Sequence, residues 1–211
     1  MSQVALPIFP LPDLTFFPRT ILPLHIFEAR YRAMVTDCLA RDKRLAVVGL
    51  KPGYEATYDG KPPVYEVTGV GRIVQWERLA TGRYNLLLRG ERRARIDREL
   101  PADTLYRMVA ATPLEETGAE GPAVQALAGR VKAQCRQILA AVGRSGAELQ
   151  QTLDELSDPA ELGDQVASAL VPIHATRQAL LEELHVERRL ERLAVALDDL
   201  LSQLTGEGGR A

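Results

Sequence analysis

The sequence of 211 residues has few of the residues that mark membrane, secreted or metal-dependent proteins. It holds two cysteines, three histidines and one tryptophan, and aromatic residues make up 5% of the chain. No apolar run approaches the roughly 18 residues of a membrane-spanning helix, and residues 1–7 lack the basic segment and apolar stretch of a signal peptide. Cys38 and Cys135 are far apart in the sequence and both fall on the apolar stripes of predicted helices, so we expect them to be buried, reduced thiols. A cytoplasmic protein is therefore the expectation.

The chain also lacks the motifs of the common nucleotide-dependent and metal-dependent enzymes. A phosphate-binding loop of the form G-x-x-x-x-G-K-S/T is absent. Gly69 and Gly71 begin a glycine pattern, but Val74 stands where a dinucleotide-binding fingerprint has its third glycine. The three histidines have no metal-ligand spacing among themselves or with the cysteines. We therefore expect no catalytic residues, no metal and no cofactor, and a protein that is not an enzyme.

The charges are distributed unevenly along the chain. Residues 1–113 carry 17 Lys+Arg against 12 Asp+Glu, a net charge of +5, whereas residues 114–211 carry 9 against 16, a net charge of −7. A polar, glycine-rich linker follows this change of sign. We therefore predict a β-rich domain over residues 1–116 and a helical domain over residues 117–205. Residues 206–211 are expected to form a disordered tail.

The first part of the chain has the pattern of a small β-sheet with one helix. Short apolar or alternating runs bounded by proline and glycine predict strands over residues 5–9, 21–24, 45–50, 64–77, 83–89, 93–100 and 106–114. Apolar residues at steps of three and four from Phe27 to Leu39 predict a helix with that face buried. Gly69 and Gly71 indicate a bulge or a barrel corner. The regular spacing of the strands favours a closed or nearly closed sheet.

Beyond the linker the hydrophobic period changes to that of helices. Apolar stripes predict helices around residues 124–142, 149–156, 160–170 and 190–204. Asp158 is a predicted N-cap followed by proline in the first turn, and Pro172 ends or kinks the helix that begins there. The last leucine series is only about two heptads long, which favours packing within a bundle over an independent coiled coil. The expected fold class is α+β: a β pseudo-barrel with one helix, followed by an all-α helical bundle.

Aromatic residues in the predicted loops and at one strand end are the candidate binding residues. They are Phe16, Phe17, Tyr54, Tyr58 and Trp76. Such residues either cap the open ends of a barrel or form an exposed apolar patch, and the second arrangement is typical of a protein-binding site. The pattern alone leaves both alternatives open.

An arginine-rich run extends across two of the predicted strands and the residues between them, at Arg89, Arg92, Arg93, Arg95 and Arg98. Acidic residues are interleaved with these arginines, which favours a strand edge of mixed charge over a phosphate-binding patch. RNA binding is therefore a lesser alternative, and nucleic acid is not the expected partner.

Several segments resemble the N-terminal, or substrate-binding, domain of Lon protease. They read LPIFPL at 6–11, LPLHIFEARY at 22–31, VYEVTGVGRI at 64–73, GRYNLLLRG at 82–90, LSDPAEL at 156–162 and QALLE at 178–182. The resemblance covers roughly residues 5–200, and the string LPLHIFE is most similar to the stand-alone bacterial members.

The resemblance implies a PUA-like pseudo-barrel of about six strands, a helical bundle after it, and a role in capturing unfolded polypeptide. In full-length Lon this region is connected to an ATPase and a Ser–Lys peptidase, for which 211 residues leave no room. We therefore expect a non-catalytic module that binds unfolded or extended polypeptide, or an unidentified protein partner. The alternatives are a structural or adaptor protein that self-associates, as a homodimer for example, or recruits a partner through its helical half, and a PUA-like RNA-binding protein.

Overall fold

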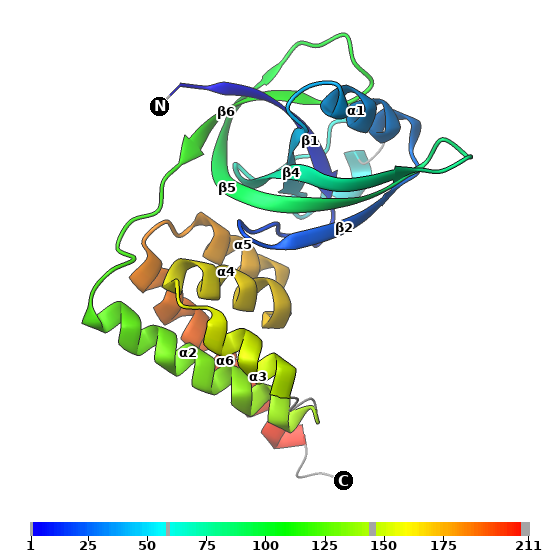
Figure 1. Ribbon diagram of the computed structural model, residues 1–211. Helices are drawn as coiled ribbons and strands as arrows, with labels where there is room; N and C mark the ends of the chain where they lie inside the picture. The colour runs from blue at the N-terminus through cyan, green and yellow to red at the C-terminus, as the bar shows by residue number, and fades with distance from the viewer. Residues whose placement is uncertain (1, 58–59, 144–146, 208–211) are drawn as a thin grey trace. The chain divides into compact units, whose positions relative to one another are not determined.

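The computed structural model describes residues 2–57, 60–143 and 147–207. The chain divides into two compact units, Met1–Leu114 and Glu115–Ala211 (Figure 1). All six described strands, one α-helix and one short 3₁₀ helix belong to unit 1, and the other five described α-helices belong to unit 2. The predicted mixed α+β class is confirmed.

Unit 1 is built on one mixed sheet. Its strands are β1 (Val4–Leu11), β2 (Ile21–Ile26), β3 (Arg44–Gly49), β4 (Val67–Arg78), β5 (Tyr84–Leu100) and β6 (Met108–Leu114). The strand order is β2-β5-β4-β3-β1-β6, and β6 also pairs with β5. The hydrogen-bonded pairing of β5, β4, β3, β1 and β6 therefore closes on itself, while β2 lies at the edge of β5.

Strand β5 runs without a break through Gly90, where the sequence predicted two separate strands. Gly90 pairs with Gly71 of β4, and the register of the two strands shifts beside this pair, between Val70 and Gly71. A Cβ at Gly90 would lie 2.1 Å from the carbonyl oxygen of Phe17. The missing side chain of Gly90 therefore lets the backbone at Phe17 pass directly over the strand. A glycine in a strand marks such a close approach as readily as it marks a break.

Helix α1 (Ala29–Leu39) packs against the strands of unit 1 (Figure 1). Its buried residues are Tyr31, Met34, Val35 and Cys38. They join a core cluster with strand residues such as Leu45, Leu86 and Leu88. A second, smaller cluster includes Ile8, Ala46, Val48, Val70 and Val109. Both faces of β3 are therefore buried, which explains its continuous apolar run.

Phe27 is the residue that departs from the predicted helical stripe. The helix begins at Ala29 with Glu28 as its N-cap residue, so Phe27 precedes the first turn. The Phe27 side chain is 59% exposed and its ring stacks on His25 of β2, with centroids 6.3 Å apart.

Unit 2 contains the helices α2 (Pro122–Ala141), α3 (Ala147–Glu155), α4 (Pro159–Leu170), α5 (His174–Glu182) and α6 (Val186–Glu207). The Asp158 carboxylate accepts a 2.9 Å hydrogen bond from the Ala160 backbone N–H, which confirms the predicted N-cap of α4. Helix α6 continues through Gly206 and Glu207, the first two residues of the predicted tail, and 208–211 lie outside the described residues. Within the described helices, none is both long and apolar enough to cross a membrane.

A buried ionic cluster fastens the linker segment to the helices of unit 2. The Arg189 side chain of α6 is fully buried and forms an ion pair with Glu116, and its Nε lies 3.6 Å from Oδ1 of the buried Asp164. The Thr117 backbone accepts a 2.8 Å hydrogen bond from the Val186 N–H. Residues 115–118 therefore belong structurally to unit 2.

Candidate functional site

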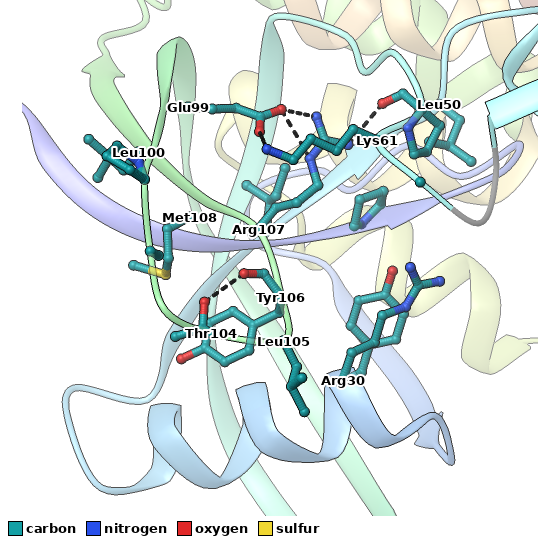
Figure 2. A pocket seen from close by; sticks show the side chains of 17 residues that line it. Arg30, Leu50, Lys61, Glu99, Leu100, Thr104, Leu105, Tyr106, Arg107 and Met108 are labelled. Atoms are coloured by element: carbon teal, nitrogen blue, oxygen red, sulfur yellow. Dashed lines mark hydrogen bonds and ion pairs between the residues drawn. The ribbon is translucent and has the colours of Figure 1, made fainter.

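A cavity of about 350 Å³ opens in unit 1 where the first turn of α1 meets the segment joining β5 to β6 (Figure 2). Its lining includes the apolar residues Ile8, Pro10, Tyr31, Leu50, Pro62, Leu100, Pro101, Leu105, Tyr106 and Met108. Ile8, Leu50 and the two tyrosines are buried, whereas Leu105 is 71% exposed. The cavity thus combines a deep apolar lining with an accessible apolar rim.

Four charged side chains line the same cavity. Glu99 at the end of β5 forms an ion pair with Arg107, whose Nε donates a 3.1 Å hydrogen bond, and a looser pair with Lys61, at 3.5 Å (Figure 2). Burial alone would raise the pKa of Glu99, but the hydrogen bonds and charges of Arg107 and Lys61 outweigh it, so the pKa lies below its usual range. Glu99 is therefore ionised at neutral pH.

The remaining charged residue of the lining is Arg30. Its guanidinium lies over the Tyr31 ring, 4.6 Å from the ring centroid, and its Nη2 is 2.9 Å from Glu28 Oε2. Arg30, Lys61 and Arg107 carry three positive charges against the single negative charge of Glu99 in the lining. Glu28, beside the cavity, offsets part of this excess.

Tyr106 and Thr104 fix the loop that forms one side of the cavity. The Tyr106 hydroxyl donates a 2.6 Å hydrogen bond to Asp37 of α1. The Thr104 hydroxyl donates a 2.7 Å bond to the Tyr106 carbonyl (Figure 2). Burial and the bond to Asp37 raise the pKa of Tyr106 to about 12. The phenol therefore stays protonated and holds the loop against α1.

A second, shallower groove of about 450 Å³ lies over the outer end of the sheet. It is lined by three consecutive residues from each of three neighbouring strands: Pro23–His25 of β2, Leu86 and its two neighbours in β5, and Gln75–Glu77 of β4. Strand β2 is the edge strand of the described sheet and pairs with β5 alone. A 2.7 Å hydrogen bond joins His25 Nδ1 and Asn85 Oδ1 across this pair.

Large apolar side chains are exposed around this groove. Trp76, which belongs to the lining, is 43% exposed, and the Lys43 ammonium lies 4.4 Å from its ring centroid. Val74 of β4 and Ile21 of β2 are 47% and 53% exposed. Ile21 begins β2 and exposed Phe27 follows its last residue, so accessible apolar groups lie at both ends of this edge strand.

Two of the five candidate aromatic residues are not accessible. Phe16 and Phe17 are 3% and 0% exposed, so of the two alternatives that the sequence left open these two residues take the buried one. The physical reason is that their backbone lies directly on glycines of the sheet: a Cβ at Gly69 would be 2.0 Å from the Phe16 carbonyl oxygen. The Arg19 N–H also donates a 2.9 Å hydrogen bond to the Gly90 carbonyl. The two phenylalanines belong to the packed sheet.

The other three candidate aromatic residues do not belong to the packed loop that contains Phe16 and Phe17. Tyr54 is half-buried in the single 3₁₀ turn Tyr54–Thr57, and Tyr58 lies outside the described residues. Trp76 lies at the groove. Neither described cavity has Tyr54 in its lining, so the structure brings only Trp76 of the five to a surface hollow that it describes.

The charged cavity was missed by the sequence analysis. Lys61 belongs to a polar loop and Arg107 precedes the last strand, and neither shows a pattern that points to the other. Their proximity depends on the Ile8 N–H, which donates a 3.0 Å hydrogen bond to the Arg107 carbonyl, and on Arg107 Nη1, which donates a 2.8 Å bond to the Pro62 carbonyl. The described residues contain no cluster of His, Cys, Asp and Glu suited to a metal ion.

Comparison with known proteins identifies the family. The model of the ATP-dependent protease La (LON) substrate-binding domain matches residues 5–199, which confirms the resemblance expected from the sequence. The Lon protease of Azospirillum brasilense is 28% identical over 203 residues, which are 95% of this chain and 25% of that protein. Lon protease 3 of Sorangium cellulosum is 29% identical over 189 residues, 89% of this chain and 22% of the relative. The chain thus spans about a quarter of the length of these relatives.

Two solved structures have the same fold. The N-terminal domain of a Mycobacterium avium complex Lon protease has a TM-score of 0.75 at 23% identity, over 93% of this chain and 99% of that one. A Lon N-terminal domain protein from Xanthomonas campestris has a TM-score of 0.67 at 25% identity, over 91% and 98% of the two chains. With a family model matching nearly its whole length, the chain belongs to the LON substrate-binding domain family.

Proposed function

We propose that the chain is a non-catalytic module that binds unfolded or extended polypeptide. The observation that carries this proposal is the match of the LON substrate-binding domain over residues 5–199. The relatives are named Lon proteases, and the chain spans about a quarter of them, so the proposal concerns recognition of a polypeptide and not its cleavage. We also propose that the closed sheet of unit 1 is a PUA-like pseudo-barrel and that the helices of unit 2 form a helical bundle.

The groove at the outer end of the sheet is the surface we propose for the polypeptide. Trp76 offers a large, partly exposed ring, and Pro23 and Leu87 add apolar surface within the lining. A bound apolar side chain would remove the exposed part of Trp76 from water, and aromatic residues of this kind carry much of the energy of protein interfaces.

The edge strand gives the groove a second means of binding. Strand β2 pairs with β5 on one side only among the described strands, so an extended segment could add to its other edge. Pro23 has no backbone N–H and limits how regular such pairing can be. Contacts to Trp76 and Phe27 would then decide which segments bind.

The single tryptophan makes this proposal directly measurable, because fluorescence excited at a wavelength that tyrosine does not absorb reports on Trp76 alone. The ligand would be an unfolded protein without tryptophan, such as reduced and carboxymethylated pancreatic ribonuclease. A saturable blue shift of the emission is expected, since binding removes water from the ring. Folded ribonuclease serves as the control and is expected to cause no shift.

A variant series assigns the binding to the groove. Calorimetry with the same unfolded ribonuclease should show that Trp76→Ala weakens binding by about 30-fold, the effect of losing about 2 kcal/mol at an interface anchor. Val195→Ala removes an exposed apolar side chain of unit 2, 58% accessible, and should leave the affinity unchanged. Equal affinity of the wild type and Trp76→Ala would remove the groove from the proposal, and no binding by the wild type would reject the function.

A further inference from the structure

We propose that the cavity between α1 and the β5–β6 segment binds the C-terminal residue of a polypeptide, with its apolar side chain inside and its α-carboxylate at the cationic rim. This inference rests on the proposed function and adds to it the part of the polypeptide that is recognised. It concerns a site separate in its lining from the groove that contains Trp76.

The size of the cavity favours a single residue. Its volume of about 350 Å³ is at the small end of the range of roughly 300–1,000 Å³ found for ligand pockets. Ile8, Leu50 and Tyr31 are at most 6% exposed and close the deep side of the cavity, and Leu105, which is 71% exposed, supplies accessible apolar surface at the rim. An apolar side chain would lose contact with water here, and the residue before it would meet Leu105.

The charges at the cavity favour an anion over a cation. Arg107 engages Glu99 through Nε and Nη2, so the one carboxylate of the lining is already neutralised. Lys61 makes only a 3.5 Å contact with that carboxylate, and its side chain is 77% exposed. Its ammonium group has three donors and can turn to a second acceptor.

Arg30 supplies a second donor group on the side of α1. Its Nε and Nη2 both contact a single oxygen of Glu28, whereas a guanidinium has five N–H donors in a planar fork. Figure 2 shows Arg30 and Lys61 extending from different segments around the same hollow. A carboxylate at the rim would accept a charge-assisted hydrogen bond from either group.

The C-terminal residue of a polypeptide can contact both the apolar lining and the cationic rim of the cavity. The side chain and the α-carboxylate of a C-terminal residue leave from the same Cα, so the apolar lining and the nearby cations are reached together. An internal acidic residue would place its carboxylate at the end of the side chain that has to fill the apolar lining. Capture of a terminal carboxylate is a known mode of peptide recognition.

The test compares N-acetyl-alanyl-alanyl-leucine with the same tripeptide as its C-terminal amide. Binding is followed by NMR shifts of the methyl groups of Ile8, Leu50 and Leu105 in the whole protein. The free acid should bind at least about tenfold more tightly than the amide, the effect of one charge-assisted hydrogen bond. Equal affinities of acid and amide, or no binding of either, would overturn the inference.

Charge variants show whether the two cations cause the preference. Lys61→Gln and Arg30→Gln should each weaken binding of the free acid while leaving the weak binding of the amide unchanged, and Lys61→Arg should restore it. Lys132→Gln makes the same charge change on α2 of unit 2 and should have no effect. An acid preference that survives the double variant would contradict the assignment of Lys61 and Arg30.

The outcome is distinguishable from failure of the proposed function. If unfolded ribonuclease binds but the tripeptide does not, polypeptide recognition stands and the cavity is not its site. If Ala102→Phe, which enlarges an exposed residue of the lining without adding a tryptophan, abolishes tripeptide binding but not the Trp76 blue shift, the two sites act separately, as we expect.

Discussion

The Tyr106 hydroxyl donates a 2.6 Å hydrogen bond to the Asp37 carboxylate, and this bond joins the segment before β6 to α1 across 69 residues of sequence. It also keeps one side of the cavity in place, because Tyr106 and Leu105 belong to the lining. The stability of this region should therefore depend on the ionisation of a single phenol.

Tyr106→Phe should lower the free energy of unfolding of unit 1 by about 1–3 kcal/mol at neutral pH, because Asp37 loses a buried donor. The folded-state pKa of Tyr106 is raised to about 12 from the ordinary value of 10.0, so its contribution is complete below pH 10 and is lost as the pH rises toward 12. Urea unfolding followed by Trp76 fluorescence measures this. The difference in the free energy of unfolding between wild type and Tyr106→Phe should shrink as the pH rises from 10 to 12. A difference that stays constant over this range would contradict the role of Asp37.

Gly90→Ala should destabilise unit 1 by about 3 kcal/mol or more. The added Cβ would lie 2.1 Å from the Phe17 carbonyl oxygen and 2.9 Å from Pro18 Cα, which are backbone atoms that cannot move alone. The control is Gly129→Ala in α2, where no described atom lies within 4 Å of the added Cβ. That change should stabilise the helix by up to about 1 kcal/mol. A small effect of Gly90→Ala on the Trp76 unfolding transition would show that the loop can leave the sheet.

Arg189→Met should destabilise unit 2 by about 3–5 kcal/mol, because it leaves Asp164 as a buried charge without its cation. Far-UV circular dichroism during urea unfolding reports mainly on the helices of this unit. Arg192→Met removes an ion pair to Glu183 from a side chain that is 57% exposed, and should cost less than about 1 kcal/mol. If both variants lose a similar free energy of unfolding, the buried ion pair of Arg189 contributes no more to stability than the exposed pair of Arg192.

Cys38 and Cys135 should be unreactive in the folded protein. Both are free and buried, and burial raises the pKa of each thiol to about 12, so almost no thiolate is present near neutral pH. A disulfide reagent that releases a coloured thiolate should detect two thiols per chain in guanidinium and close to none under native conditions. Rapid native labelling of either thiol would show that its surroundings open readily.

The positions of most strands and helices could be predicted from local sequence. Hydrophobic period separates the sheet from the helices, and the caps are local: Asp158 and Pro159 begin α4 at the predicted place. The run from Leu45 to Leu50 indicates a buried strand because its residues enter two core clusters at once. Such features depend on neighbours within a few positions, which a single sequence displays.

The burial of Phe16 and Phe17 could not be predicted in the same way. It depends on Gly69, Gly71 and Gly90, whose missing side chains admit the loop backbone. These glycines are more than fifty residues away, and in the sequence they indicate a bulge or a kink equally well. A loop with two aromatic residues and several prolines therefore resembles an exposed patch until its partners are known.

The candidate site was predictable only in part. Trp76 was identified as an aromatic residue near a strand end, and it is exposed at a groove. The pairing of Lys61 and Arg107 around Glu99 arises from the closure of the sheet, which places two loops far apart in sequence on one cavity. Nothing in the local pattern of either loop indicates this neighbour.

The closure of the sheet sets the order in which unit 1 can assemble. Val4 at the start of β1 pairs with Ala111 in β6, so the first strand has to wait for the last before the ring is complete. Contacts of such long sequence separation are associated with slow folding. During synthesis β3 can pair with β1 and β4, but the other edge of β1 has no partner until β6, which ends at Leu114, has emerged. The nascent unit therefore presents one open strand edge until its last strand is made.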